Sequence, residues 1–142
     1  MKYENECVTY FAAKSQNESL TRVLVTSFLA TYDPTVSEIT DVKTAVSEAV
    51  TNAIIHGYEG QDGMVELFCG YAEETIYIEV ADKGKGIGDI TRAMEPLYTS
   101  KPELERSGMG FTIMEAFMEG IMVVSTPNLG TRVSMYKKLS RE

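Results

Sequence analysis

Residues 37–56 carry the longest helical pattern in the chain, and this pattern limits the folds available to it. Apolar residues recur at positions i, i+3, i+4 and i+7, which predicts a helix that begins near Ser37, runs to His56 and is capped by Gly57. Such a continuous apolar stripe has to be buried against another layer. Its members are Val42, Ala45, Val46, Ala49, Val50, Ala53 and Ile54.

A second, polar stripe follows the same helix. Glu48, Asn52 and His56 recur at every fourth residue, and four residues of an α-helix turn by about 400°, so these side chains drift by only about 40° per step. A carboxylate, a carboxamide and an imidazole beside a core suggest a site. His56 is the only histidine, and we favour a phosphate-site neighbour or a hydrogen bond at the helix end over a catalytic or phosphorylated group.

The remaining patterns predict strands over 7–13, 64–72, 75–82, 121–127 and 131–139, and helices over 17–33 and 108–120. Asn17 or Ser19 is the expected cap of the first helix, and Pro34 should stop it. The 64–72 and 75–82 strands form a hairpin around Glu73 and Glu74. We therefore expect one α+β domain over 1–142, a two-layer sandwich with helices on one face of a mixed, mostly antiparallel sheet.

Composition excludes several classes of protein. The net charge of −8 disfavours direct binding to nucleic acid or an anionic membrane, although a partner with a basic face remains possible. No apolar run approaches the roughly 20 residues of a membrane span, so we expect a cytoplasmic protein. Cys7 and Cys69 lie in separate predicted strands; we expect free buried thiols, with a disulfide or a reactive pair as the alternative.

Three glycine-containing segments suggest a ligand site. "DKGKGIG" places Asp82, Gly84, Gly86 and Ile87 directly after a strand, where glycines allow close backbone approach. "RSGMGF" opens the helix near 108 with glycines, and a helix N-terminus offers free N–H groups to a phosphate. "GTRV" places Thr131 at the start of the last strand. Residues 83–107, which include most of the first segment and the start of the second, lose periodicity and are expected to form a lid.

The order of these segments resembles a known family. "EAVTNAIIHGY", "DKGKGIG" and "GMGF" are similar to the N box and the two glycine boxes of the ATPase superfamily that contains gyrase, Hsp90, histidine kinases and MutL. Within it, "NESLTR", "SEAVTNAIIHGY", "PLYTSKPE" and "ERSGMGF" resemble the anti-sigma factor serine kinases of spore-forming bacteria over the whole chain. The resemblance implies a Bergerat-type ATP-binding fold, with ATP or ADP and Mg²⁺ as cofactors.

The same resemblance implies roles for individual residues. Glu48 would act on the attacking hydroxyl, and Asn52 would hold Mg²⁺. Asp82 would accept from the adenine amino group, with Gly86 passing under the base and Thr131 on the same polar edge. The further expected ATP-binding residues are His56, Gly84, Ile87, Thr99, Ser100, Lys101, Arg106, Ser107, Gly108, Met109 and Gly110.

The implied function is sequestration of a sporulation sigma factor together with phosphorylation of a serine on an anti-anti-sigma protein. The alternatives are a nucleotide-gated binding module without turnover, or a plain ATPase. Arg22 is either a solvated charge or a contact for both partners, and a homodimer is implied through a sheet face or edge without helices. Met114 and Met118 suit core packing better than a partner groove.

Overall fold

The computed structural model describes residues 2–86 and 110–140, and their elements follow the predicted order. Strand β1 starts earlier than predicted, and helix α1 is shorter than the predicted 17–33. Strands β2 and β3 have the predicted bounds. The elements are β1 (Asn5–Ala12), α1 (Gln16–Ala30), α2 (Val36–Thr51), the π-helix η1 (Asn52–Gly57), β2 (Met64–Ala72), β3 (Thr75–Asp82), α4 (Gly110–Phe117), β4 (Gly120–Thr126) and β5 (Gly130–Lys138).

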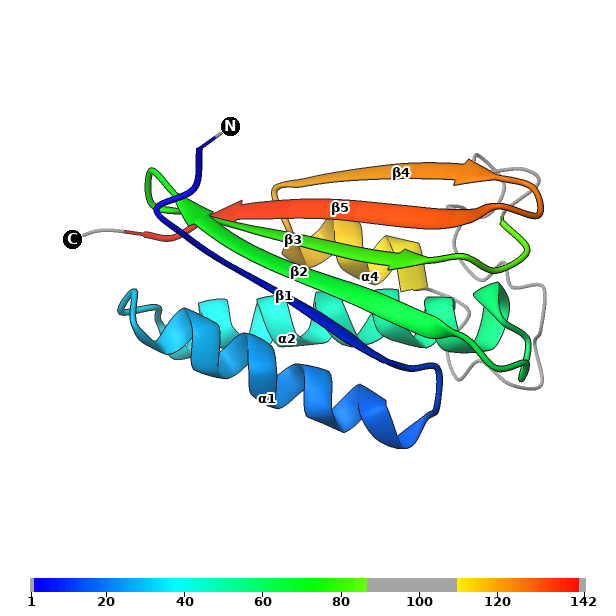
Figure 1. Cartoon of the computed structure of the whole chain (residues 1–142). Helices are drawn as coiled ribbons and strands as arrows, with labels where there is room; N and C mark the ends of the chain where they lie inside the picture. The colour runs from blue at the N-terminus through cyan, green and yellow to red at the C-terminus, as the bar shows by residue number, and fades with distance from the viewer. Residues whose placement is uncertain (1, 87–109, 141–142) are drawn as a thin grey trace.

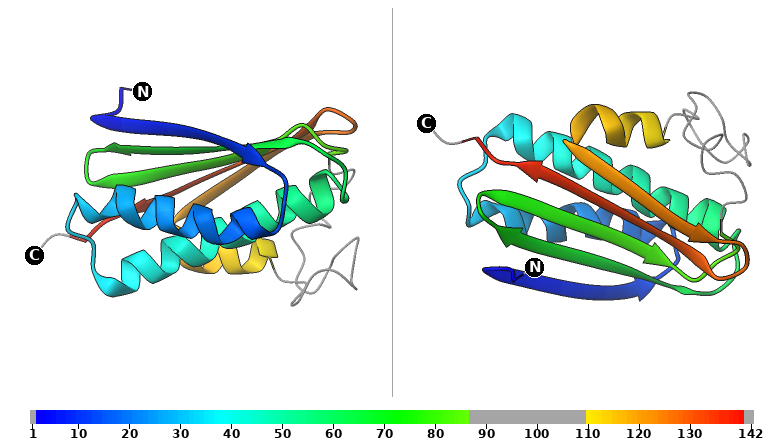
Figure 2. Two further views of the ribbon diagram at one scale, coloured as in Figure 1. Left: turned by 60° about the horizontal axis from the view of Figure 1, so that its bottom comes forward. Right: turned by 90° about the horizontal axis from the view of Figure 1, so that it is seen from above.

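The strands form one sheet, and the helices lie on one of its faces. The strand order is β1-β2-β3-β5-β4, and each of these neighbouring pairs is antiparallel, so the expected mixed sheet is antiparallel among the described strands. Figures 1 and 2 show α1, α2 and α4 together below the sheet. The predicted α+β two-layer fold is therefore confirmed.

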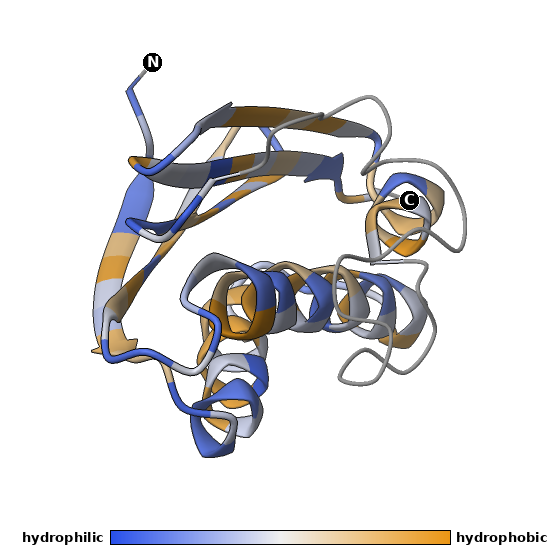
Figure 3. Cartoon of the chain, turned by 90° about the vertical axis from the view of Figure 1, so that its right-hand side faces the viewer, coloured by the Kyte–Doolittle hydropathy of each residue, from blue (hydrophilic) through white to orange (hydrophobic). Residues whose placement is uncertain are grey.

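The apolar stripe of α2 forms the centre of the core, as its spacing predicts. All seven of its members are buried, and α2 packs between α1 and α4 beneath the sheet. Figure 3 shows the sheet curving around these helices. Met114 and Met118 are buried in the same cluster, which confirms the core-packing interpretation of both methionines. Each fully buried Val or Met side chain of this core contributes about 1.5–3 kcal/mol to stability relative to leaving it exposed.

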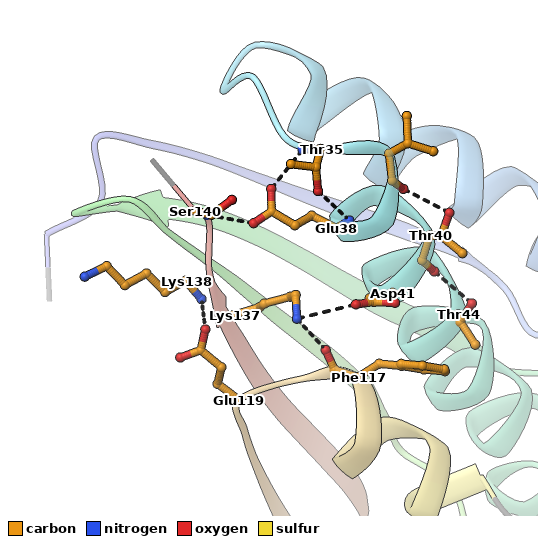
Figure 4. Close-up of polar contacts among 11 residues, drawn as sticks. Thr35, Glu38, Thr40, Asp41, Thr44, Phe117, Glu119, Lys137, Lys138 and Ser140 are labelled. Carbon is orange, nitrogen blue, oxygen red and sulfur yellow. Dashed lines mark hydrogen bonds and ion pairs between the residues drawn. The ribbon is translucent and has the colours of Figure 1, made fainter. Parts of the chain in front are cut away.

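The first turn of α2 is tied to the end of the chain. Thr35 Oγ1 accepts from the Glu38 backbone N–H at 3.0 Å, while Glu38 Oε1 accepts from the Thr35 N–H at 2.8 Å, which completes a capping box. The other carboxylate oxygen of Glu38 accepts from the Ser140 N–H at 2.7 Å (Figure 4). One buried carboxylate therefore connects the start of α2 to the residues after β5.

Helix α1 begins differently from the prediction. Its N-cap is Ser15, whose side chain makes no capping hydrogen bond. Asn17, one of the two expected caps, instead donates from Nδ2 to the carbonyl of Ala12 at 2.9 Å. The predicted cap is wrong because Asn17 already lies inside the helix and its amide closes the turn that follows β1.

The two cysteines lie on neighbouring strands. Neither forms a disulfide; Cys69 is buried, whereas Cys7 is exposed, which corrects the expectation that both thiols are buried. The difference arises because the inward side of β1 is deeply buried only at Phe11. Among the described helices, none has the length and apolar character needed to cross a bilayer.

Candidate nucleotide-binding site

Three segments that are distant in the sequence meet at one end of the molecule. They are η1, the end of β3 with the residues after it, and the turn between β4 and β5, all at the right of Figure 1. Contacts of η1 with both β3 and β5 hold this arrangement. The predicted residues Asp82, Gly84 and Gly86 lie in these segments, and Thr131 lies in β5 just after the turn.

Asp82 is the buried polar group at this junction, with only 9% of its surface exposed. Its Oδ1 accepts from the Gly84 N–H at 2.8 Å, and the backbone of Thr131, its partner on β5, also donates to the carboxylate. Burial raises the pKa of the Asp82 carboxyl above its ordinary value, while these two hydrogen bonds act in the opposite direction. A carboxylate has about four acceptor positions, so it can accept further hydrogen bonds from a ligand.

The chain around Asp82 approaches other backbone too closely for side chains. A Cβ on Gly84 would lie 1.9 Å from the carbonyl oxygen of Gly57, and the Lys85 N–H donates to that same oxygen at 2.9 Å. Gly86 has a φ of +77°, and a Cβ there would lie 2.3 Å from the Thr126 carbonyl oxygen. The glycines of "DKGKG" therefore let this loop fit between η1 and the β4–β5 turn.

Several residues that build this site were not singled out from the sequence. The Tyr58 hydroxyl donates to the Met64 carbonyl at 2.6 Å and accepts from the Lys83 N–H at 2.8 Å, which joins the loop to the start of β2. The Lys85 carbonyl accepts from the Asn128 N–H. Tyr58 follows Gly57 directly in "IIHGY", but the motif cannot reveal its bond to Lys83, which is 25 residues away in the sequence.

Thr131 contributes to a small polar cluster on β4 and β5. Its Oγ1 lies 2.8 Å from Ser125 Oγ, and the two residues face each other in the β4–β5 register. Ser125 Oγ also donates to the Gly130 carbonyl at 3.2 Å. The structure therefore places Thr131 opposite Asp82 in the β3–β5 register, and the role in adenine binding that the resemblance implies for it stays a prediction.

The helix that carries Glu48, Asn52 and His56 changes its geometry within that stripe. The α-helix ends at Thr51, and η1 continues to Gly57 with wider turns, as shown by the Tyr58 N–H donating to the Ala53 carbonyl. The predicted helix had about the right extent, but its C-terminal part, Asn52–Gly57, forms a π-helix and not an α-helix. All three side chains are half-buried. Short π-helical turns often occur at functional sites because they redirect side chains.

Gly110 is the described member of the second glycine segment. It is buried and is the first residue of α4, which packs against α2. The predicted positions Ile87, Thr99, Ser100, Lys101, Arg106, Ser107, Gly108 and Met109 lie outside the described residues, as does most of the expected lid over 83–107. Arg22 lies away from the junction on α1, about half exposed, and pairs through Nε with Glu18 at 3.0 Å.

The described residues fit an adenine nucleotide. The buried carboxylate of Asp82 suits an exocyclic amino group, and the close-fitting glycines beside it leave the loop backbone unobstructed by side chains. Asn52 offers an amide oxygen, a hard donor of the kind that Mg²⁺ prefers, and it is only half-buried. Phosphate-binding residues are expected around Gly110, where α4 begins.

Comparisons with known proteins agree with this fit. The family model for the histidine kinase-like ATPase domain matches residues 11–137. An anti-sigma F factor from Clostridium botulinum (strain Eklund 17B / Type B) is 57% identical over 139 residues, covering 97% of each chain. An anti-sigma F factor from Halalkalibacterium halodurans is 54% identical over 96% of this chain and 94% of its own.

A solved structure shows the same fold. The crystal structure of the RsbU and RsbW domains of a Mycobacterium tuberculosis protein matches 97% of this chain and 33% of its own, with a TM-score of 0.67 at 20% identity. The fold, the geometry of the glycine loop and the sequence similarity over nearly the whole chain thus lead to one assignment. The chain belongs to the anti-sigma F factor family, within the histidine kinase-like ATPase domains.

Proposed function

We propose that this protein is an anti-sigma factor and a protein serine kinase. It binds a sporulation sigma factor and, with Mg-ATP, phosphorylates a serine of an anti-anti-sigma protein, which inactivates that protein. The buried carboxylate of Asp82, next to a loop in which Gly84 and Gly86 have no room for a side chain, is the observation that most directly supports nucleotide binding. The names of the relatives support the sigma-binding part.

Nucleotide binding begins at the base. Asp82 accepts from the exocyclic amino group, and because Gly84 and Thr131 already hold its carboxylate, it is oriented before the ligand arrives. Asn52 offers its amide oxygen to Mg²⁺. The N–H groups at the start of α4 face the phosphates, for which a helix N-terminus is a suitable partner. Mg-ATP, when bound, supplies the phosphoryl group that is transferred.

Glu48 handles the acceptor hydroxyl in this proposal. It lies one turn before Asn52 on the same helix, and a carboxylate in that place can orient a serine hydroxyl and accept its proton. Since phosphoryl transfer depends mostly on positioning and electrostatics, the rigid attachment of α2 to the core supports catalysis. A module that only binds nucleotide would have no use for this carboxylate.

The partners would use surfaces outside the nucleotide site. Arg22, half exposed on α1, is the proposed contact for both the sigma factor and the anti-anti-sigma protein. The homodimer is proposed to form through the sheet face that carries no helices. That face exposes a set of large apolar side chains, which is unusual for a surface meeting only water. They are Val8, Tyr10, Met64, Met122, Val124 and Tyr136.

The kinase assignment is tested with Glu48→Gln against Glu115→Gln, a surface carboxylate on α4. We expect Glu48→Gln to abolish phosphoryl transfer and to leave ATP affinity within a few-fold, with the Glu115 variant unchanged in both. Loss of ATP binding in Glu48→Gln would contradict its role. Full transfer activity in that variant would favour a different base.

The two alternatives make different predictions. A nucleotide-gated binding module would bind ATP and the sigma factor without any change in the anti-anti-sigma protein. A plain ATPase would release phosphate steadily with no protein acceptor present. Phosphate release measured with and without the anti-anti-sigma protein separates both alternatives from the kinase.

A further inference from the structure

The only two cysteines of the chain face each other across a strand pair. Cys7 on β1 and Cys69 on β2 are direct partners in the antiparallel register. Partners in such a register point to the same side of the sheet, and their Cα atoms lie about 4.5–5.5 Å apart. That spacing falls within the roughly 4.4–6.8 Å spanned by disulfides. The backbone therefore brings the two thiols within bonding reach.

The electrostatics of the pair agree with this proximity. Burial, together with a smaller contribution from the nearby Cys7, raises the pKa of the Cys69 thiol to about 12. Cys69 is 3% exposed and belongs to the core, so reagents in solvent do not reach it. By contrast, Cys7 is exposed, on a strand at the edge of the sheet, with the Thr9 hydroxyl 3.9 Å from its sulfur.

These two environments divide the chemistry between the sulfurs. A reagent in solution meets Cys7 first, because only that thiol is exposed. Cys69 can then react only at the Cys7 sulfur once that sulfur has been modified. The strand pair holds the two sulfurs close together, so the local concentration of one at the other is high. This is the arrangement of an accessible thiol with an adjacent resolving thiol.

We propose that Cys7 and Cys69 form a reversible oxidation site for hydroperoxides. The Cys7 sulfur attacks the terminal peroxide oxygen and the O–O bond breaks. The departing oxygen takes up the Cys7 thiol proton and leaves as an alcohol (or as water from hydrogen peroxide), so that Cys7 becomes a sulfenic acid. The Cys69 sulfur then attacks the Cys7 sulfur, the S–O bond breaks, and the hydroxyl leaves as water with the Cys69 proton. Two thiols are oxidised to a disulfide, and one hydroperoxide is reduced.

The product would join the edge strand β1 to β2. Because Cys7 and Cys69 are far apart in the sequence, the crosslink closes a long loop and restricts the unfolded chain. The oxidised protein should therefore unfold at a temperature several degrees higher than the reduced protein. A thiol reductant would return it to the original state.

The test uses the reduced full-length protein treated with tert-butyl hydroperoxide under native conditions. Intact mass spectrometry should show the loss of two hydrogen atoms, and peptide mapping should find the Cys7 peptide joined to the Cys69 peptide. Cys7→Ser should show no such loss. In Cys69→Ser, or in Cys69→Ala if the serine variant does not fold, oxidation of Cys7 should end at the sulfenic acid or at a disulfide between two protein molecules.

Three results would overturn the proposal. They are crosslinks between molecules in the wild type, Cys7 oxidised beyond the sulfenic acid with Cys69 still a thiol, and a disulfide that forms only after denaturation. Reversal of both the mass change and the rise in unfolding temperature by dithiothreitol would support it.

Discussion

Asp82 is a carboxylate whose position costs stability. Burial raises its pKa in the folded protein above the ordinary 3.8, so the folded state holds a proton more tightly than the unfolded chain does. The contribution of Asp82 to the free energy of unfolding therefore falls as the pH rises from about 3.8 through the folded-state pKa. At neutral pH this contribution is lower than it is below pH 3.8. A group retained under such a penalty is a reasonable candidate for function.

Asp82→Asn should separate stability from nucleotide binding. The amide removes the buried charge, and its oxygen can still accept from the Gly84 N–H, so the free energy of unfolding at pH 7 should be unchanged or higher. ATP affinity should fall by at least tenfold, the equivalent of about 1.4 kcal/mol. Urea unfolding and calorimetry measure the two effects, and unchanged ATP affinity would exclude the proposed contact with adenine.

Alanine substitutions at Gly86 and Gly60 separate two costs of adding a side chain, a clash with neighbouring backbone and the strain of a positive φ. Both have positive φ, +77° and +82°, but a Cβ on Gly60 meets no atom within 4 Å, whereas one on Gly86 meets the Thr126 carbonyl. Gly60→Ala should cost only the conformational strain, about 1–2 kcal/mol. Gly86→Ala should cost more and also weaken ATP binding. Equal costs in urea unfolding would show that the loop can move away from β4.

At the level of elements, the regular patterns were predicted well, whereas the cap of α1 and the change of helix type at Asn52 were not. The alternation in 64–72 and 75–82 gave the two strands with their observed bounds, although both turn residues between them, Glu73 and Glu74, adopt positive φ. The change from α2 to η1 has no counterpart in the apolar spacing, because Ala53 and Ile54 continue the apolar pattern of α2 and are buried as that pattern predicts. In the structure η1 contacts β3 and β5, which are distant in the sequence.

Glu38 should stabilise the start of α2 in a pH-dependent way. Burial alone would raise the pKa of its carboxyl, but the N–H groups of Thr35 and Ser140 outweigh burial and hold that pKa below 4.5. Its contribution is thus present above pH 4.5 and is lost as the pH falls through the lowered folded-state pKa.

Glu38→Gln tests this contribution. Loss of the charged capping box should cost about 1 kcal/mol at pH 7, and the difference from the wild type should shrink as the pH falls below 4.5. Thr44→Ala, which removes an exposed hydroxyl from the same helix, is the matched control and should change little. A Glu38→Gln penalty that stays constant down to acid pH would contradict the sign of the shift.

At the scale of the whole molecule, the sequence predicted which segments form the site but not how they touch. "DKGKGIG" and the last hairpin were identified separately, while the fit of Gly84 under Gly57 and the bond from Asn128 to Lys85 depend on tertiary packing. Contacts of this kind leave no periodic signal. The positions that the family resemblance assigns between 87 and 109 remain predictions.

The proposed homodimer is also a property of the whole molecule. Met122 is 66% exposed on the face without helices, so Met122→Asp should cost little folding stability but should place a charge in the dimer interface. Val36→Asp, on a side chain 81% exposed at the start of α2, is the control. Sedimentation velocity should show a dimer for the wild type and the control and a monomer for Met122→Asp. If all three proteins are dimers, the sheet face around Met122 is not the dimer interface.

Phosphoryl transfer to a protein serine is the reaction that defines the proposed kinase, and intact-protein mass spectrometry detects it. An anti-anti-sigma protein is incubated with this protein, Mg²⁺ and ATP, with Glu48→Gln in parallel. We predict a single phosphoryl group on one serine of the substrate with the wild type and none with the variant. An unmodified substrate, although ATP is bound, would contradict the kinase assignment and leave a nucleotide-gated binding module or an ATPase.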